Sequence, residues 1–136
     1  MMRLIPGFLT LCLTAFLLVS CSEEKPAANI AVKAPDETAA LAALREINSA
    51  QADFIRRTRR YAQTTNELIA DHLLTAEPKA EGYTILMLPS PDAGSYTITA
   101  TPSTPDARHF FTDKTGVIHA ENGKAATAES PAVRGK

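Results

Sequence analysis

The 136-residue chain contains only two cysteines, Cys12 and Cys21, and no tryptophan. Because both cysteines precede residue 22, the rest of the chain has no disulfide and no thiolate ligand for a metal. Glycine is also scarce, with six residues, and none of them belongs to a phosphate-binding glycine loop. The 14 basic and 15 acidic residues nearly balance, so the composition gives no reason to expect nucleic acid as a partner.

Catalytic and metal-binding motifs are missing as well. His72, His109 and His119 are scattered and form no HxH or HxxxH pair. His109 and His119 are expected on the last two strands, where a weak metal site competes with plain cross-strand packing, and we favour the packing. Asp113 lies in an expected turn, but Ca²⁺ takes six or more oxygen ligands and only one acid is local. The serines after residue 90 lack the framing of a catalytic nucleophile. We therefore expect no enzyme, no metal, no cofactor and no small-molecule substrate.

A long apolar run is present near the start of the chain. Residues 4–20 follow Met1-Met2-Arg3 and are almost entirely hydrophobic, and the sequence turns polar directly after Cys21. Leu18-Val19-Ser20-Cys21 resembles the lipobox of bacterial lipoprotein signals, with an aliphatic residue at −3, a small residue at −1 and Cys at +1. The resemblance implies cleavage between Ser20 and Cys21, diacylation of the Cys21 thiol and, usually, acylation of the new amino terminus.

Two other interpretations of residues 1–20 stay open. A transmembrane helix is one, although 17 residues interrupted by Pro6 and Gly7 are short for a span of roughly 20. The other is an ordinary signal peptide that ends near a cysteine. We favour a lipoprotein signal over residues 1–20 and a membrane as partner through the lipid on Cys21. Ser22, rather than Asp, resembles lipoproteins sent to the outer membrane, so we expect its periplasmic face rather than the inner membrane.

The following residues predict a tether and two helices. Residues 21–35 contain two prolines and no periodicity, which indicates a flexible tether. Asp36 can cap a helix that continues to about Ala62. A second, short helix is expected over 64–75, capped by Thr64 or Thr65. Spacing at 100° per residue gives the first helix one narrow, mostly small-residue stripe, formed by Ala40, Ala43, Leu44, Ile47, Ala50, Gln51, Phe54, Ile55, Thr58, Tyr61 and Ala62.

Four arginines fall on the side of this helix opposite the stripe: Arg56, Arg57, Arg59 and Arg60. Such a run is found in sites that bind DNA, anionic lipid or polysaccharide. It is also typical of a solvated helix C-terminus, where positive charge is favourable. Only Tyr61 lies close by, so the aromatic platform of a single-strand binder is missing. We favour the solvated face.

After Gly82 the apolar period changes from 3.6 to 2. Strands are expected over 83–88, 96–101, 108–112 and 117–120, the first buried on both faces and the second with threonines on its wet face. Two consecutive hairpins make an antiparallel meander. The predicted fold is an α+β domain over residues 36–122 in which the long helix lies across one sheet face. Residues 123–136 have little to bury and are expected to form a loose tail.

This succession of elements resembles the periplasmic part of type IV pilins and type II secretion pseudopilins. The resemblance covers residues 40–128 and includes Gly82-Tyr83, YTITATP at 96–102 and RHFFTDKTGVI at 108–118. It implies a pilin-like head and is silent about chemistry.

The amino-terminal part departs from the pilin pattern. Gly7-Phe8 could imitate a prepilin cleavage site, but the fifth residue is Cys12 rather than Glu, and Pro26 and Pro35 interrupt any continuous helix. We therefore expect a lipid-anchored, pilin-like structural or interaction protein that contacts an envelope, secretion or pilus protein through its sheet or a strand edge. The alternatives are a polyanion-binding module that uses the arginines, and a prepilin-type subunit cleaved after Gly7.

Overall fold

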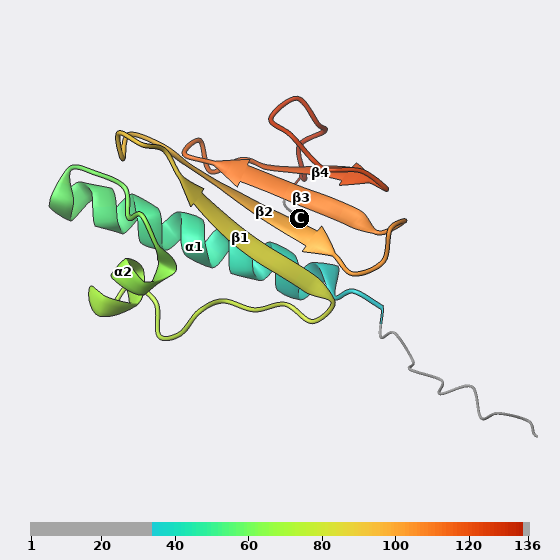
Figure 1. The fold of residues 1–136 in the computed structure, drawn as a ribbon, viewed down its shortest axis with the longest axis horizontal. Coiled ribbons are helices and arrows are strands. Elements are labelled where there is room, and N and C mark those ends of the chain that lie inside the picture. The colour runs from blue at the N-terminus through green and yellow to red at the C-terminus, as the bar shows by residue number, and fades with distance from the viewer. Residues whose placement is uncertain (1–33, 135–136) are drawn as a thin grey trace, which may run out of the picture. The chain divides into compact units, whose positions relative to one another are not determined.

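The structure is a computed structural model and describes residues 34–134. It contains two helices, α1 (Glu37–Thr58) and α2 (Thr65–Ala70), followed by the strands β1 (Tyr83–Pro89), β2 (Tyr96–Pro102), β3 (Arg108–Asp113) and β4 (Ile118–Asn122). The strands form one antiparallel sheet in the order β1-β2-β3-β4 (Figure 1). The predicted α+β arrangement with a meander sheet is confirmed. The predicted signal at 1–20, Cys21 and all but the last two residues of the predicted tether lie outside the described residues.

Helix α1 begins where the sequence predicts. The Asp36 carboxylate accepts a hydrogen bond from the Ala39 N–H at 2.9 Å, and Glu37 places a second negative charge in the first turn. The helix ends earlier than expected, at Thr58 rather than near Ala62, because Arg59 adopts a left-handed conformation with φ 66°. The backbone of Ala62 is bonded instead to the buried side chain of Gln51.

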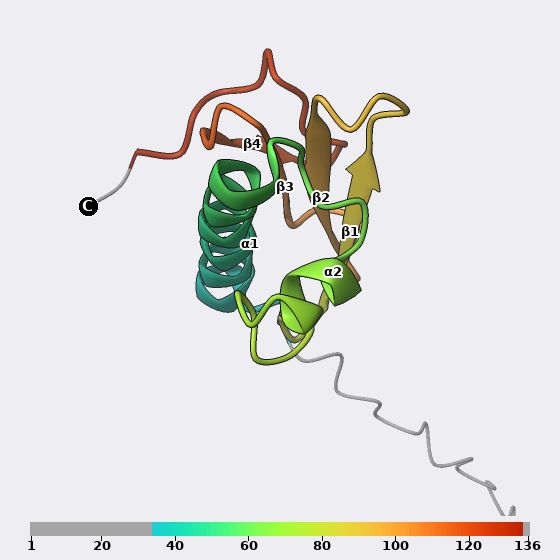
Figure 2. The same cartoon turned by 90° about the vertical axis from the view of Figure 1, so that its left-hand side faces the viewer.

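One face of α1 packs against the sheet (Figure 2). Its buried residues all belong to the predicted stripe: Ala40, Ala43, Leu44, Ile47, Ala50, Gln51 and Phe54. The alanines let the helix approach β2 and β3 closely, where Ile98, Ala100 and Phe110 complete the core. Burial of this apolar surface is the main force that holds helix and sheet together.

Helix α2 is shorter than the sequence indicates. Thr64 caps it through its hydroxyl, which accepts from the Glu67 N–H at 3.3 Å. The predicted helix over 64–75 is wrong beyond Ala70, because His72 has φ 58° and the N–H groups of Leu73 and Leu74 both return to the carbonyl of Leu68. This closed turn buries Leu68 and Leu74 against the core.

The sheet has one buried and one exposed face. On β2, Tyr96, Ile98 and Ala100 are buried while the threonines between them face outward, as predicted. β1 was expected to be buried on both faces, and this is wrong: Leu86 and Leu88 are each 51% exposed. Both helices lie on the other side of β1, so no second layer from residues 34–134 covers its outward side chains.

Candidate interaction surface at the free sheet edge

The two edges of the sheet differ in what covers them. Along β4, the N–H of Ala120 donates to the Pro131 carbonyl at 2.9 Å, and the N–H of Val133 donates to the Ile118 carbonyl at 2.7 Å. His119 Nδ1 also lies 2.6 Å from the Ser130 carbonyl oxygen. The prediction of a loose tail is therefore wrong for residues 130–133, which pair with β4 because its edge groups lack another partner.

The outer edge of β1 is much less covered, since among residues 34–134 only Ala80 pairs with it, through a bridge to Tyr83. The N–H of Tyr83 points away from β2, since it donates to Ala80 at 3.1 Å, whereas the carbonyl of Gly82 accepts from Ser103 on the β2 side at 2.8 Å. Backbone groups alternate along an antiparallel strand, so those of Ile85 and Met87 also point away from β2. Within residues 34–134 the outward N–H and C=O groups of Ile85 and Met87 have no hydrogen-bond partner.

This open edge also lacks charge. β1 reads YTILMLP and carries no ionisable group except the Tyr83 phenol. Edge strands in soluble proteins are commonly protected by Lys, Pro, a bulge or a covering segment, because unpaired strands template association. Within residues 34–134 the protection consists of Pro89 at the end of the strand and of Ala80, which pairs with Tyr83 at its start. We call the outward backbone of Ile85–Met87 the open edge.

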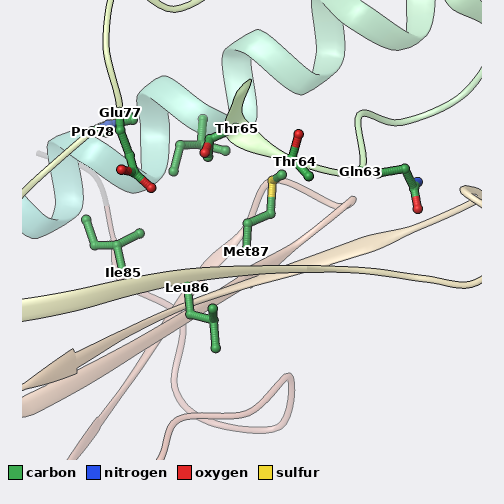
Figure 3. Close-up of a pocket in the computed structure, with 9 residues that line it drawn as sticks. Gln63, Thr64, Thr65, Glu77, Pro78, Ile85, Leu86 and Met87 are labelled. Atoms are coloured by element: carbon green, nitrogen blue, oxygen red, sulfur yellow. The ribbon is translucent and has the colours of Figure 1, made fainter. Parts of the chain in front are cut away.

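A pocket of about 160 Å³ lies directly beside the open edge (Figure 3). Ile85 and Met87 point into it from the strand (Figure 3). Thr64 and Thr65 face them from the start of α2, and Glu77 and Pro78 face them from the loop after it. The remaining lining residues are Ile47, Gln63 and Leu86. We call this space the edge pocket.

Gln51 determines where one wall of the edge pocket stands. Its side chain is fully buried, its Oε1 accepts from the Ala62 N–H at 2.9 Å, and its Nε2 donates to the Ala62 carbonyl at 3.0 Å. The same Nε2 lies 3.2 Å from Met87 Sδ. One helical side chain thus fixes both the linker that leads to Thr64 and the strand residue opposite it.

The arginine run is largely neutralised within the domain. Arg56 pairs with Asp53, Arg57 pairs with Asp71 at 3.2 Å, and Arg60 pairs with Glu67 at 2.7 Å. The Arg60 guanidinium also lies 5.2 Å from the centre of the Phe54 ring. Of the four, only Arg59 makes no ion pair with any residue between 34 and 134. Three of the four arginines are thus paired with acidic side chains of the domain, all of them near the surface.

The histidines do not come together. His109 pairs in register with Glu121, and His119 pairs with Phe111, so the two rings do not oppose each other across the last hairpin. Over the described part of the chain, no three His, Cys, Asp or Glu residues are grouped closely enough to hold a metal ion. Asp113 uses its carboxylate to close the β3–β4 turn, where it accepts from the Thr115 N–H at 2.8 Å and from the Thr115 hydroxyl at 2.6 Å.

Comparison with known proteins gives no family for the chain. No family model, curated protein or solved structure matches it. Between residues 34 and 134, no helix has the length and apolar character needed to cross a bilayer.

The sequence-based site residues thus divide into two groups. Ser20 and Cys21 lie outside the described residues, and the arginines are brought together only as locally paired surface charges. The open edge and the edge pocket were not singled out from the sequence, although a sheet or strand edge was expected to bind partners. An uncharged run at 83–89 with Pro only at its end was the signal available.

Proposed function

We propose that the protein is a lipid-anchored, pilin-like interaction protein of the bacterial envelope without catalytic activity. Cys21 carries the lipid, the favoured location is the periplasmic face of the outer membrane, and the partner is another envelope, secretion or pilus protein. The sequence supports the anchor through the lipobox, and the fold supports the head because its helix-on-meander arrangement is the one that the pilin resemblance implies.

The observation that carries the binding role is the asymmetry of the sheet edges. β4 is covered by the chain's own residues 131–133, whereas the backbone groups of the open edge of β1 have no partner among residues 34–134 and stand next to two half-exposed leucines. A strand added by a partner would satisfy those groups and cover Leu86 and Leu88, which is the recognised mode of strand addition. The polyanion alternative has no comparable support, since three of the four arginines are paired.

Capture from crosslinked, detergent-solubilised envelopes tests this role. The wild-type protein should retain a specific envelope, secretion or pilus protein, and Leu88→Lys should lose most of it because a charge beside the edge opposes strand addition. Thr101→Lys is the matched control, because Thr101 is exposed on the adjacent strand β2, away from the open edge. Equal capture by the two variants, or no specific protein with the wild type, would contradict the proposal.

A further inference from the structure

We propose that the open edge and the edge pocket bind a short extended segment of a partner protein, with two consecutive aliphatic residues followed by a cationic one. This inference rests on the proposed function, because it specifies the chemistry that the partner presents to the same edge.

The backbone sets the length and direction of the segment. Tyr83 already uses its outward N–H on Ala80, and Pro89 has no N–H, so the available window is Ile85–Met87. An antiparallel strand that places residues opposite Ile85 and Met87 exchanges two hydrogen bonds with each of them. Three residues of the partner are therefore sufficient to form these hydrogen bonds. From its amino to its carboxyl end, the first lies opposite Met87, the second opposite Leu86 and the third opposite Ile85.

The edge pocket selects the first of these residues. A side chain opposite Met87 lies on the same sheet face as Met87 and so enters the space above the fully buried Ile47. The pocket has a volume of about 160 Å³ and combines apolar walls from Ile47, Ile85 and Met87 with polar ones. An aliphatic side chain such as that of Val or Leu fits. It is buried there against Ile85 and Met87, and it covers the exposed parts of these two side chains in turn.

Leu86 determines which type of side chain is favoured at the second partner residue. It points to the other face of the strand from Ile85 and Met87 (Figure 3) and is 51% exposed. The partner residue opposite it emerges on that outer face, beside Leu86 and diagonal to Leu88. An aliphatic side chain there removes apolar surface of both partners from water.

Glu77 determines which charge is favoured at the third partner residue. It is the one charged residue among the nine that line the edge pocket, and it has no ion pair among the described residues. Its carboxylate points from the loop toward β1 in the neighbourhood of Ile85 (Figure 3). Lys79 does not line the edge pocket, but it lines the adjoining space together with Glu77, Ile85 and Tyr83. It forms no ion pair with Glu77. A Lys or Arg opposite Ile85 therefore meets a free carboxylate, whereas an Asp or Glu there is repelled.

A synthetic peptide tests the inference directly. The probe is N-acetyl-Ser-Val-Leu-Lys-Ser-amide, titrated into the full-length ¹⁵N-labelled protein purified from membranes in detergent. We expect saturable amide shifts at Ile85, Met87 and Thr65 and none at Ala120 on the opposite edge. Replacing Lys by Gln in the peptide should weaken binding roughly two- to five-fold, as expected for an exposed ion pair. Glu77→Gln should weaken binding of the Lys peptide equally, with no further loss when both changes are combined.

Backbone-modified peptides separate strand addition from nonspecific hydrophobic contact. N-methylation of the Val or Lys amide removes a hydrogen bond to β1 and should abolish the shifts. N-methylation of the Leu amide, which points away from β1, is the matched control and should leave binding within about two-fold. Equal loss with all three peptides, or shifts confined to detergent-facing residues, overturns the inference.

Three further outcomes would separate this inference from the proposed function or from self-association. A concentration-dependent dimer in sedimentation that dissociates in Leu86→Lys would give the open edge to a second copy and overturn the inference. Envelope capture that is lost in Leu88→Lys but unaffected by Glu77→Gln and by excess peptide would leave the proposed function standing and reject this segment chemistry. Peptide binding without any captured envelope protein would support this segment chemistry and reject the proposed function.

Discussion

Gln51 shows how one buried polar side chain organises the region around the edge pocket. It satisfies both backbone groups of Ala62, which is itself fully buried, and it contacts Met87 from the same amide. A buried amide that lacks partners costs about 1–3 kcal/mol per group. The residue therefore matters for where α1 ends and for where the linker to α2 begins.

We expect Gln51→Leu to lower the free energy of unfolding by about 2–4 kcal/mol, because the N–H and C=O of Ala62 would stay buried without partners. Gln63→Leu is the matched control, since Gln63 is only half-buried and donates one long bond of 3.3 Å to the Tyr61 carbonyl. Urea unfolding followed by circular dichroism measures both. A Gln51→Leu midpoint equal to that of Gln63→Leu would show that the linker finds other partners.

Tyr96 makes the stability of the domain sensitive to alkaline pH. Its hydroxyl donates to Asn48 Oδ1 at 3.0 Å, and Asn48 in turn donates to Thr112, which is fully buried. Burial is the main reason that the pKa of Tyr96 lies above its ordinary value of 10.0, and the charges of Tyr61 and Asp113 raise it further. The fold thus favours the neutral phenol.

The sign of the pH dependence follows from this shift. The contribution of Tyr96 is fully present below pH 10, where the phenol of the unfolded chain is also neutral, and it is lost as the pH rises toward the higher pKa of the folded state. We expect the free energy of unfolding to fall between pH 10 and 12, and to fall less steeply in Tyr96→Phe. Part of the slope should remain in that variant, because burial and the nearby Glu37 also raise the pKa of Tyr83. An unchanged slope in Tyr96→Phe would contradict this assignment.

At the scale of elements, the tail after β4 acts as a short added strand. The antiparallel bridge between His119 and Ala132 and the burial of Ala126 show that residues 126–133 belong to the folded domain. We expect removal of residues 126–136 to cost about 1–3 kcal/mol, since two backbone hydrogen bonds and the burial of Ala126 and Val133 are lost.

Removal of the tail should also promote self-association, because it exposes a second unpaired edge. Urea unfolding and sedimentation velocity measure the two effects. Truncation after Arg134 is the control, since it keeps every bond to β4. If the longer truncation were as stable and as monomeric as this control, residues 126–133 would be dispensable to the fold.

The regular elements were predictable because each depends on local pattern. The Asp36 cap, the apolar stripe of α1 and the alternation along β2 are all visible in the sequence, and each is found in the structure. The early end of α1 was not predictable, because the sequence near Arg59 favours a helix and the tertiary bonds from Gln51 to Ala62 override it.

The tail and the open edge were hidden for a related reason. Residues 126–133 have no apolar period, and they are held by backbone groups that any sequence possesses. The faces of β1 are equally apolar in sequence, so only the placement of the helices decides that Ile85 and Met87 turn inward and Leu86 turns outward. Pairing along a sheet is a property of the assembled fold, and so the candidate site became visible only there.

For the whole molecule, the charge pattern argues against binding by long-range attraction. Removal of Arg3 with the predicted signal leaves 13 basic and 15 acidic residues, a net charge of about −2. The arginine cluster is compensated by Asp53, Glu67 and Asp71. Recognition at the open edge instead depends on close contact, and a membrane anchor would favour it by keeping protein and partner in the same layer.

The anchor is tested by the intact mass of the protein purified from the membrane fraction. We expect a chain that begins at Cys21 and carries the mass of one diacylglyceryl group on the thiol, usually with a further acyl group on the new amino terminus. Cys21→Ala should keep residues 1–20 and lose the added mass, because the thiol is the acceptor of the lipid. A chain that begins at Phe8 would instead establish the prepilin alternative, and an unmodified chain that begins at Cys21 would establish an ordinary signal peptide. Either result would remove the lipid anchor while leaving the open edge of β1 to be tested by the peptide.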